Sequence, residues 1–354
     1  MESLRFILLI SLGLVLALLW NAWQQDYGSM QTNQAEAIKE KKPSADVPPS
    51  IPPTTTSITS PGPLASGLNP EEGEIEVTTD TYRARISLHG GSLVSLDLLK
   101  FPVSLKEADK PTRILSNDPQ NLYVVQGGLL SNDPAPTHDS KFSSSRLVYA
   151  LNPGSETLEV PLVWDSGGGI IVNKTYEFRK NRYLITVKYD IRNNSNSPWT
   201  GEAYGQMQRT EGKKERRAVY TYTGAVISSA ESRYEKISFD DMRKENLSRT
   251  IINGWVAMIQ HYFLAAVIPY STTDAQHYYS LFIDKQHSGN NADRFVIGAA
   301  TPRVVVAPGE HRTIQQDFYI GPKVQSELEK IAPGLELTVD YGKLWFLAIL
   351  IETE

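Results

Sequence analysis

Polar and apolar residues alternate along three well-separated segments of this chain, and no other feature of the sequence constrains its fold as strongly. The segments are residues 82–88, 158–164 and 183–191. Because successive side chains of a β-strand point to opposite faces, a period of two predicts a strand with one buried face. In the third segment the polar members are expected to face water: Thr186, Lys188 and Asp190.

Turn-forming tripeptides lie between these segments. They are His-Gly-Gly at 89–91, Asn-Pro-Gly at 152–154, Gly-Gly-Gly at 167–169 and Ala-Pro-Gly at 307–309. Glycine and proline at this spacing are typical of antiparallel hairpins, and later strands are predicted at 303–306 and 312–320. Strands and helices do not alternate along the chain, so a doubly wound parallel sheet is not expected. The sequence therefore predicts an all-β fold of the sandwich type.

The most apolar internal run covers residues 254–269 and reads GWVAMIQHYFLAAVIP. It is too short and too mixed to cross a bilayer. We expect buried strand structure there, with a β-bulge or with one strand continuing into another.

One short helix is predicted near the C-terminus. Pro322 is expected to open it, and Pro333 with Gly334 to stop it. Its apolar face should pack on the sandwich rather than contact a membrane, and consists of Val324, Leu328 and Ile331.

The composition excludes several classes of protein. The chain has 24 glycines and 21 prolines, which disfavours a bundle of long helices. It has no cysteine, so disulfides, thiolate metal sites and a thiol nucleophile are excluded. The net charge of -5 gives no general attraction to nucleic acid, which we do not expect as a partner. One basic cluster, interrupted by Glu211 and Glu215, is interpreted as a solvated loop: Lys213, Lys214, Arg216 and Arg217.

The N-terminal segment predicts a membrane anchor. Residues 6–20 are almost unbroken apolar sequence, and Ala22 and Trp23 extend the run to the length of a bilayer span. A cleaved signal peptide would need small residues directly after the run, whereas the Ala35-Glu36-Ala37 pattern lies far beyond it. The nearest downstream charge is Asp26, so we expect the N-terminus inside and the bulk of the chain outside.

Residues 24–70 lack hydrophobic periodicity, and prolines, serines and threonines dominate residues 43–63. Such a segment cannot bury enough apolar surface to fold. We interpret it as a disordered linker that holds the globular part away from the membrane.

The sequence contains none of the common motifs of catalysis or cofactor binding: no phosphate-binding loop, dinucleotide fingerprint, paired-histidine zinc motif or serine elbow. We therefore predict no catalytic residue, no metal site and no cofactor. One enzymatic alternative stays open, because His261 with Tyr262, and His277 with Tyr278 and Tyr279, would suit a sugar-binding cleft. The other interpretation is that both sets alternate in ordinary strands.

Four parts of the sequence together resemble a known family. They are the opening span ending in LLWNAWQQD, the glycine pair at 90–91, the run at 254–269, and the stretch from IGPK to IAPGLELTVDYG at 320–342. In these parts the chain resembles the amino-terminal half of the YidC membrane protein insertases of Gram-negative bacteria. The residues that carry the match are expected to be structural: Gly90, Gly91, Gly254, Trp255, Pro269, Gly321, Pro322, Asp340, Tyr341 and Gly342.

The resemblance implies a specific architecture. Residues 1–23 would be the transmembrane anchor, 24–70 the linker, 71–340 a periplasmic β-supersandwich of the galactose-mutarotase type with a short C-terminal helix, and 341–354 the start of the membrane part. The protein would reside in the bacterial inner membrane, with its main domain in the periplasm. Its partners would be nascent integral membrane proteins, the lipid bilayer and the Sec translocon.

The implied function is to aid the insertion and folding of membrane proteins, without a cofactor or chemical turnover. In the family, the insertion groove lies in five further spans, which the resemblance places beyond residue 354. The C-terminus departs from the family because Lys343 replaces an aromatic residue and the apolar residues 344–351 run into Glu352, Thr353 and Glu354. We therefore expect a truncated or frameshifted product, or a fragmentary gene model, that lacks the five-span core. The alternative function is an anchored periplasmic sugar-binding or mutarotase-like module.

Overall fold

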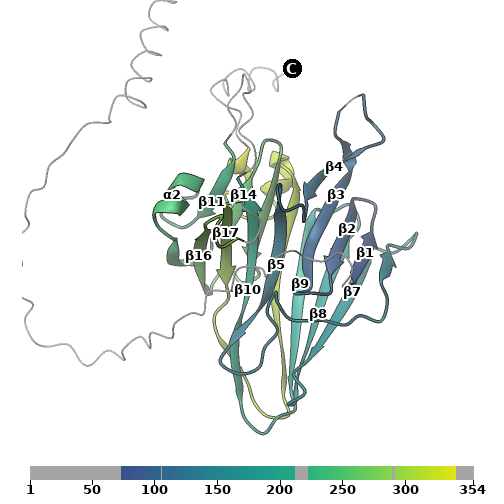
Figure 1. Cartoon of the computed structure of the whole chain (residues 1–354), viewed down its shortest axis with the longest axis vertical. Coiled ribbons are helices and arrows are strands. Elements are labelled where there is room, and N and C mark those ends of the chain that lie inside the picture. The colour runs from purple at the N-terminus through teal and green to yellow at the C-terminus, as the bar shows by residue number, and fades with distance from the viewer. Residues whose placement is uncertain (1–72, 105, 212–221, 289–291, 340–354) are drawn as a thin grey trace, which may run out of the picture. The chain divides into compact units, whose positions relative to one another are not determined.

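Two β-sheets packed face to face make up the part of the chain that the computed structural model describes (Figure 1). The described residues are 73–104, 106–211, 222–288 and 292–339. The predicted span, the predicted linker and the basic cluster at 213–217 lie outside them, as do residues 340–354.

The larger sheet has eleven strands among the described residues. They are β1 (Glu74–Thr78), β2 (Tyr82–Ser87), β3 (Ser92–Pro102), β4 (Pro111–Leu115), β5 (Tyr123–Ser131), β6 (Val148–Ala150), β10 (Trp199–Thr210), β13 (Ser248–Ile252), β16 (Ala275–Ile283), β17 (Arg294–Ala300) and β18 (Val304–Val306). Their order is β13-β16-β17-β10-β5-β3-β2-β1-β6, with β18 paired to β10 and β4 paired to β3. The pairing of β1 with β6 is parallel, and the other strand pairs that we describe in this sheet are antiparallel.

The smaller sheet has eight strands in the same described ranges. They are β7 (Thr157–Asp165), β8 (Ile170–Arg179), β9 (Leu184–Asn193), β11 (Gly224–Ser228), β12 (Glu235–Ile237), β14 (Trp255–Ile259), β15 (Phe263–Pro269) and β19 (His311–Pro322). Their order is β12-β11-β14-β15-β19-β9-β8-β7, antiparallel throughout.

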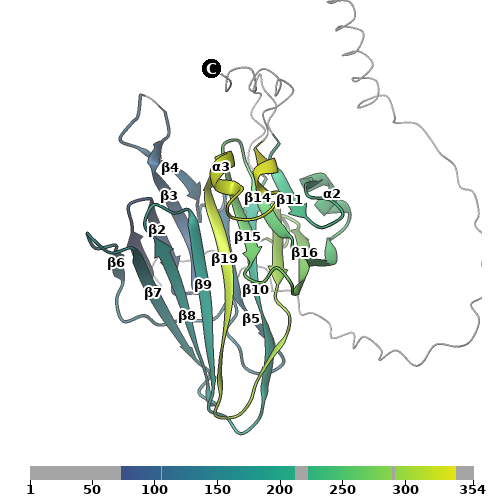
Figure 2. The same ribbon diagram turned by 180° about the vertical axis from the view of Figure 1, so that it is seen from behind.

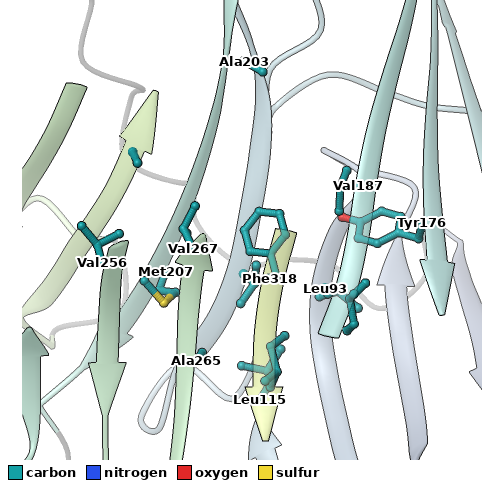
Figure 3. Packing of buried hydrophobic residues seen from close by; sticks show 14 of the residues in the cluster. Leu93, Leu115, Tyr176, Val187, Ala203, Met207, Val256, Ala265, Val267 and Phe318 are labelled. Atoms are coloured by element: carbon teal, nitrogen blue, oxygen red, sulfur yellow. The ribbon is translucent and has the colours of Figure 1, made fainter. Parts of the chain in front are cut away.

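The inward faces of the two sheets form one apolar core. Figure 3 shows members contributed by both sheets, among them Leu93 and Met207 from the larger sheet and Val267 and Phe318 from the smaller one. This core accounts for the alternation read from the sequence, because one face of each strand is turned to the opposite sheet.

The strands predicted from alternation are confirmed as β2, β7 and β9, and the two late strands as β18 and β19. In β9 the four apolar residues from Ile185 to Ile191 are fully buried. The expectation that Thr186 faces water is wrong. Its side chain is buried because its hydroxyl donates a hydrogen bond to Asp317 Oδ1 on β19, at 2.7 Å.

The predicted turns are confirmed by backbone geometry. A glycine with positive φ lies in each of the four predicted tripeptides: Gly90 (78°) and Gly91 (55°), Gly154 (88°), Gly167 (70°) and Gly169 (99°), and Gly309 (79°). Glycine adopts these conformations without the steric cost that a Cβ would bring.

The predicted C-terminal helix is shorter than expected and begins later. Pro322 is the last residue of β19, and α3 covers a single turn, Gln325–Leu328, followed by the 3₁₀ turn η2, Leu335–Thr338. A second helix, α2 (Phe239–Lys244), was not predicted; Ser238 and Asp241 form its capping box. No helix of the described ranges combines the length and apolar character needed to cross a bilayer.

Candidate functional site

The two sequence blocks that carry the family resemblance most specifically pack against each other. Residues 254–269 form the hairpin of β14 and β15, and residues 323–339, which we term the C-terminal cap, cover the outer face of that hairpin. The two blocks are far apart in sequence, yet they contribute to one apolar cluster, the cap interface: Trp255, Ala257, Ile259, Leu264, Ala266 and Ile268 from the hairpin, and Leu328, Ala332 and Leu335 from the cap.

Both strands of the hairpin are apolar throughout because both faces of the hairpin are covered. Val256, Met258, Ala265 and Val267 point into the core between the sheets, and the alternate residues point to the cap. Strands buried on both faces read as continuous hydrophobic runs rather than as alternating ones. The prediction of buried strands is confirmed, but the connection is a turn at residues 260–262 between antiparallel strands, not a bulge.

Trp255 holds the cap to the hairpin. Its side chain is fully buried, and its Nε1–H donates to the carbonyl oxygen of Pro333 at 3.1 Å. The neighbouring Gly254 leaves room for β11, since a Cβ there would lie 2.2 Å from the carbonyl oxygen of Ser228. The cap turns back at Gly334, which has a φ of 84°. This geometry explains why glycine and tryptophan stand together at 254–255.

Three further family-motif residues lie at the ends of the strands that support the cap. Gly321 packs tightly, because a Cβ there would lie 2.7 Å from Tyr183 Cβ. The carbonyl oxygen of Pro322 accepts a hydrogen bond from the Tyr319 hydroxyl at 2.6 Å. Pro269 ends β15 opposite Gln316. Asp340, Tyr341 and Gly342 lie outside the described residues.

A fully buried lysine fixes the glycine pair at 90–91. Lys174 Nζ donates to the carbonyl oxygens of Gly90 at 3.2 Å, Gly91 at 2.8 Å and Gly127 at 2.8 Å. The hydroxyl of Tyr176 donates to the same Gly91 oxygen at 2.5 Å. Since Lys174 is on β8 and the glycines belong to the other sheet or its turns, these bonds tie the two sheets together.

Sequence reasoning missed Lys174, although a signal was present. Lys174 points inward from β8, on the same face of the strand as Ile170, Val172 and Tyr176. A charged residue at an inward position requires polar partners inside the protein. The three backbone carbonyls are those partners. The aromatic rings of Phe142, Tyr176 and Tyr189 also surround the ammonium group, with centroids 5.4–5.6 Å from Nζ.

Lys174 should make stability depend on pH. Burial lowers the pKa of Lys174 to about 7, whereas an unfolded lysine has a pKa near 10.4. Between these values the unfolded chain binds more protons, so the free energy of unfolding should rise with pH. From pH 7 to pH 9 this contribution is about 2 kcal/mol. Lys174→Met should remove it, as measured by urea unfolding of residues 73–339 at both pH values. An equal pH dependence in the two proteins would show that the folded lysine keeps an ordinary pKa.

The residues of the enzymatic alternative fall in different sheets. His261 is in the turn between β14 and β15, and His277 is on β16. The rings of His277 and Tyr279 stack at 6.3 Å, and the Tyr279 hydroxyl donates to Gln206, whose amide donates to Gln126. Among the described residues this network joins a phenol and two amides, whereas sugar chemistry of the predicted kind uses a histidine and a carboxylate. Within the described ranges no cluster of three or more histidines and carboxylates is arranged to hold a metal ion.

A shallow polar depression lies elsewhere, near the junction of β9 and β19. Its lining carries both signs of charge and none of the family-motif residues: Asp190, Arg192, Asn194, Gly309, Glu310, His311 and Thr313. Nothing in it resembles an apolar ligand pocket.

Comparison with known proteins identifies relatives along nearly the whole chain. The model of the YidC periplasmic domain matches residues 74–352. The membrane protein insertase YidC of Methylococcus capsulatus is 38% identical over 98% of this chain, and that of Coxiella burnetii is 36% identical over 99%. The corresponding protein of Thioalkalivibrio sulfidiphilus is 37% identical over 98%. In each case the match covers 63% of the relative, so the chain spans less than two thirds of the length of these proteins.

Solved structures show weaker likenesses. A galactose mutarotase related enzyme from Lactobacillus acidophilus has a TM-score of 0.43 at 9% identity, covering 70% of this chain and 97% of the enzyme. The α-galactosidase AgaB from Geobacillus stearothermophilus has a TM-score of 0.45 at 9% identity, covering 76% of this chain and 42% of the α-galactosidase. Likenesses at this level assign no sugar chemistry to the chain.

Proposed function

Because this chain belongs to the YidC family of membrane protein insertases, we propose that it forms the extracytoplasmic β-domain of such an insertase and aids the insertion and folding of integral membrane proteins. The observation that carries the proposal is the match to the YidC periplasmic domain over residues 74–352. The relatives are named as membrane protein insertases.

We further propose the location and partners that the family implies. Residues 1–23 would anchor the chain in the inner membrane, residues 24–70 would act as the linker, and residues 71–340 would form a periplasmic domain of the β-supersandwich class. Residues 341–354 would begin the membrane-embedded part. Nascent membrane proteins would be the substrates, and the bilayer and the Sec translocon would be the partners. The apolar run at 6–23 and the two-sheet core support this arrangement.

The packing of the sandwich supports a division of labour within the insertase. Its strands turn their apolar faces to each other, and the outer face of β14 and β15 is covered by the cap. Within the described residues these apolar faces pack against each other or against the cap, and so are not offered to a nascent hydrophobic segment. The sandwich would therefore support insertion from outside the membrane rather than perform it.

Growth of cells depleted of their own insertase tests the proposal. The chain should restore growth when it is joined, beyond residue 339, to the portion of a YidC relative that extends past the match. The complete relative serves as the positive control. Failure of the joined protein to restore growth, while it accumulates in the membrane to the level of the control, would argue against an insertase role.

A further inference from the structure

Two equally exposed tyrosines lie at opposite ends of the same strand. Tyr262 is in the turn that precedes β15, and Tyr270 directly follows β15; each has 66% of its surface exposed. The seven-residue strand between them makes eight residue steps, so they lie about 26 Å apart. They differ in their surroundings, because only Tyr262 is next to the C-terminal cap.

Contacts tie the Tyr262 turn to the cap. The backbone N–H of Lys323 donates to the carbonyl oxygen of Tyr262 at 2.8 Å. Beside it the cap exposes two aliphatic side chains, Val324 at 41% and Leu337 at 43%. Val324 thus departs from the packed face predicted for it, whereas Leu328 of that face is buried. The hairpin of β3 and β4 lies at the same end of the sandwich as α3, as Figure 2 shows. There the ring of Phe101 packs 5.9 Å from the ring of Phe263, the residue that follows Tyr262.

The short connection between the cap and the next apolar run restricts where the cap end of the sandwich can lie. Val339 packs against the cap interface, and residues 344–351 are eight consecutive apolar residues, LWFLAILI. Apolar sequence of this kind partitions into a bilayer or its interface. Five residue steps separate Val339 from Leu344, so the cap stays within about 18 Å of the point where the apolar run begins.

The N-terminal connection sets no comparable limit. About fifty residues lie between Trp23 and Gly73, and even a compact random coil of that length spans about 40 Å. The short C-terminal connection therefore decides which end of the sandwich is held at the membrane. The long N-terminal connection can span the remaining distance in either orientation.

We propose that the cap end of the sandwich, presenting Tyr262, Val324 and Leu337, rests on the lipid headgroup layer of the membrane. The proposal rests on the proposed function only for the attachment of the chain to a bilayer. A tyrosine ring suits this position, since its apolar body faces the acyl boundary and its hydroxyl faces water.

The contact of the cap end with the headgroup layer depends on the short C-terminal connection rather than on a strong affinity of the surface for lipid. Two cations near it are already paired, because Arg182 and Lys330 both contact Glu327, at 3.7 Å and 3.2 Å. Three apolar side chains would not hold a soluble domain on lipid by themselves. A short connection raises the effective concentration of the surface next to the bilayer, which turns a weak contact into a persistent one.

The absence of cysteine from the sequence makes the test direct. Tyr262→Cys and Tyr270→Cys each provide one labelling site for an environment-sensitive fluorophore, and both residues are surface-exposed, so neither change should disturb the core. Each labelled full-length chain is reconstituted into vesicles of phosphatidylethanolamine and phosphatidylglycerol that contain a lipid with a nitroxide at its headgroup.

The label at position 262 should be quenched at least several-fold more than the label at position 270, and its emission should shift to the blue. Equal quenching at both positions, or stronger quenching at 270, would overturn the proposed orientation. The measurement does not involve insertion activity. Equal quenching together with growth rescue by the joined protein would therefore remove the membrane contact and leave the proposed function standing.

Discussion

Replacing Trp255 with alanine should lower the free energy of unfolding of residues 73–339 by about 3–5 kcal/mol, the usual cost of truncating a buried tryptophan. The ring is fully buried in the cap interface, and its Nε1–H is bonded to Pro333. The substitution leaves a cavity between the hairpin and the cap. Urea unfolding measures the loss, and amide hydrogen exchange in residues 325–339 should accelerate before the rest of the domain is affected.

Two variants serve as controls for this change. Trp255→Phe keeps most of the packing and removes the hydrogen bond, so its cost should be about 1–2 kcal/mol. Trp164→Ala removes a partly buried ring from β7, at the far side of the sheet, and should leave exchange in the cap unchanged. Equal protection of the cap in Trp255→Ala and the parent protein would show that the cap is not held by this side chain.

Replacing Gly90 with alanine should cost about 2–5 kcal/mol, because two penalties act together. The φ of Gly90 is 78°, and an L-residue in that region costs about 1–2 kcal/mol. In addition, the new Cβ would lie 2.0 Å from the carbonyl oxygen of His138, and relieving such a clash costs about 1–3 kcal/mol. Urea unfolding of residues 73–339 measures the sum.

Gly309 is a matched control for this prediction. Its φ is 79°, but a Cβ there would have no neighbour within 4 Å. Gly309→Ala should therefore carry only the conformational penalty, about 1–2 kcal/mol. If the two alanine variants unfold at the same urea concentration, the backbone around His138 can move aside at little cost. The close packing at Gly90 would then not contribute to stability.

Local patterns in the sequence were sufficient to predict some of the strands and turns of the sandwich. Alternation identified β2, β7 and β9, because in each of them only one face meets the core. The turns were identified by glycines that need positive φ, such as Gly90 and Gly309. Both signals depend on a few neighbouring residues, so the sequence displays them directly.

Features that depend on distant contacts were missed or misjudged. Thr186 was assigned to the solvent face, since its partner Asp317 lies 131 residues away in the sequence. Pro322 was taken as the start of a helix, but β15 pairs with β19 as far as this residue and extends the strand. The burial of Lys174 likewise depends on Gly127, which belongs to the opposite sheet.

The physical role of the family-motif residues also depends on distant contacts. The resemblance alone indicated that Gly254, Trp255 and Gly321 matter, without a physical reason. The cap interface supplies that reason, because the resembling blocks at 254–269 and 320–342 pack on each other. The apolar face predicted at residues 324–331 indicated packing on the sandwich, but neither block indicated that its partner is the other block.

The central claim is that this chain provides the outer domain of an insertase whose inserting surface lies elsewhere, and one measurement tests it most directly. In cells depleted of their own insertase, the inserted fraction of a single-span reporter protein is determined from its accessibility to protease added outside the inner membrane. The chain joined to the remaining part of a YidC relative should restore insertion, and deleting residues 73–322 from the joined protein should matter far less. The 354-residue chain alone should leave the reporter uninserted. Insertion of the reporter by this chain alone would contradict the account.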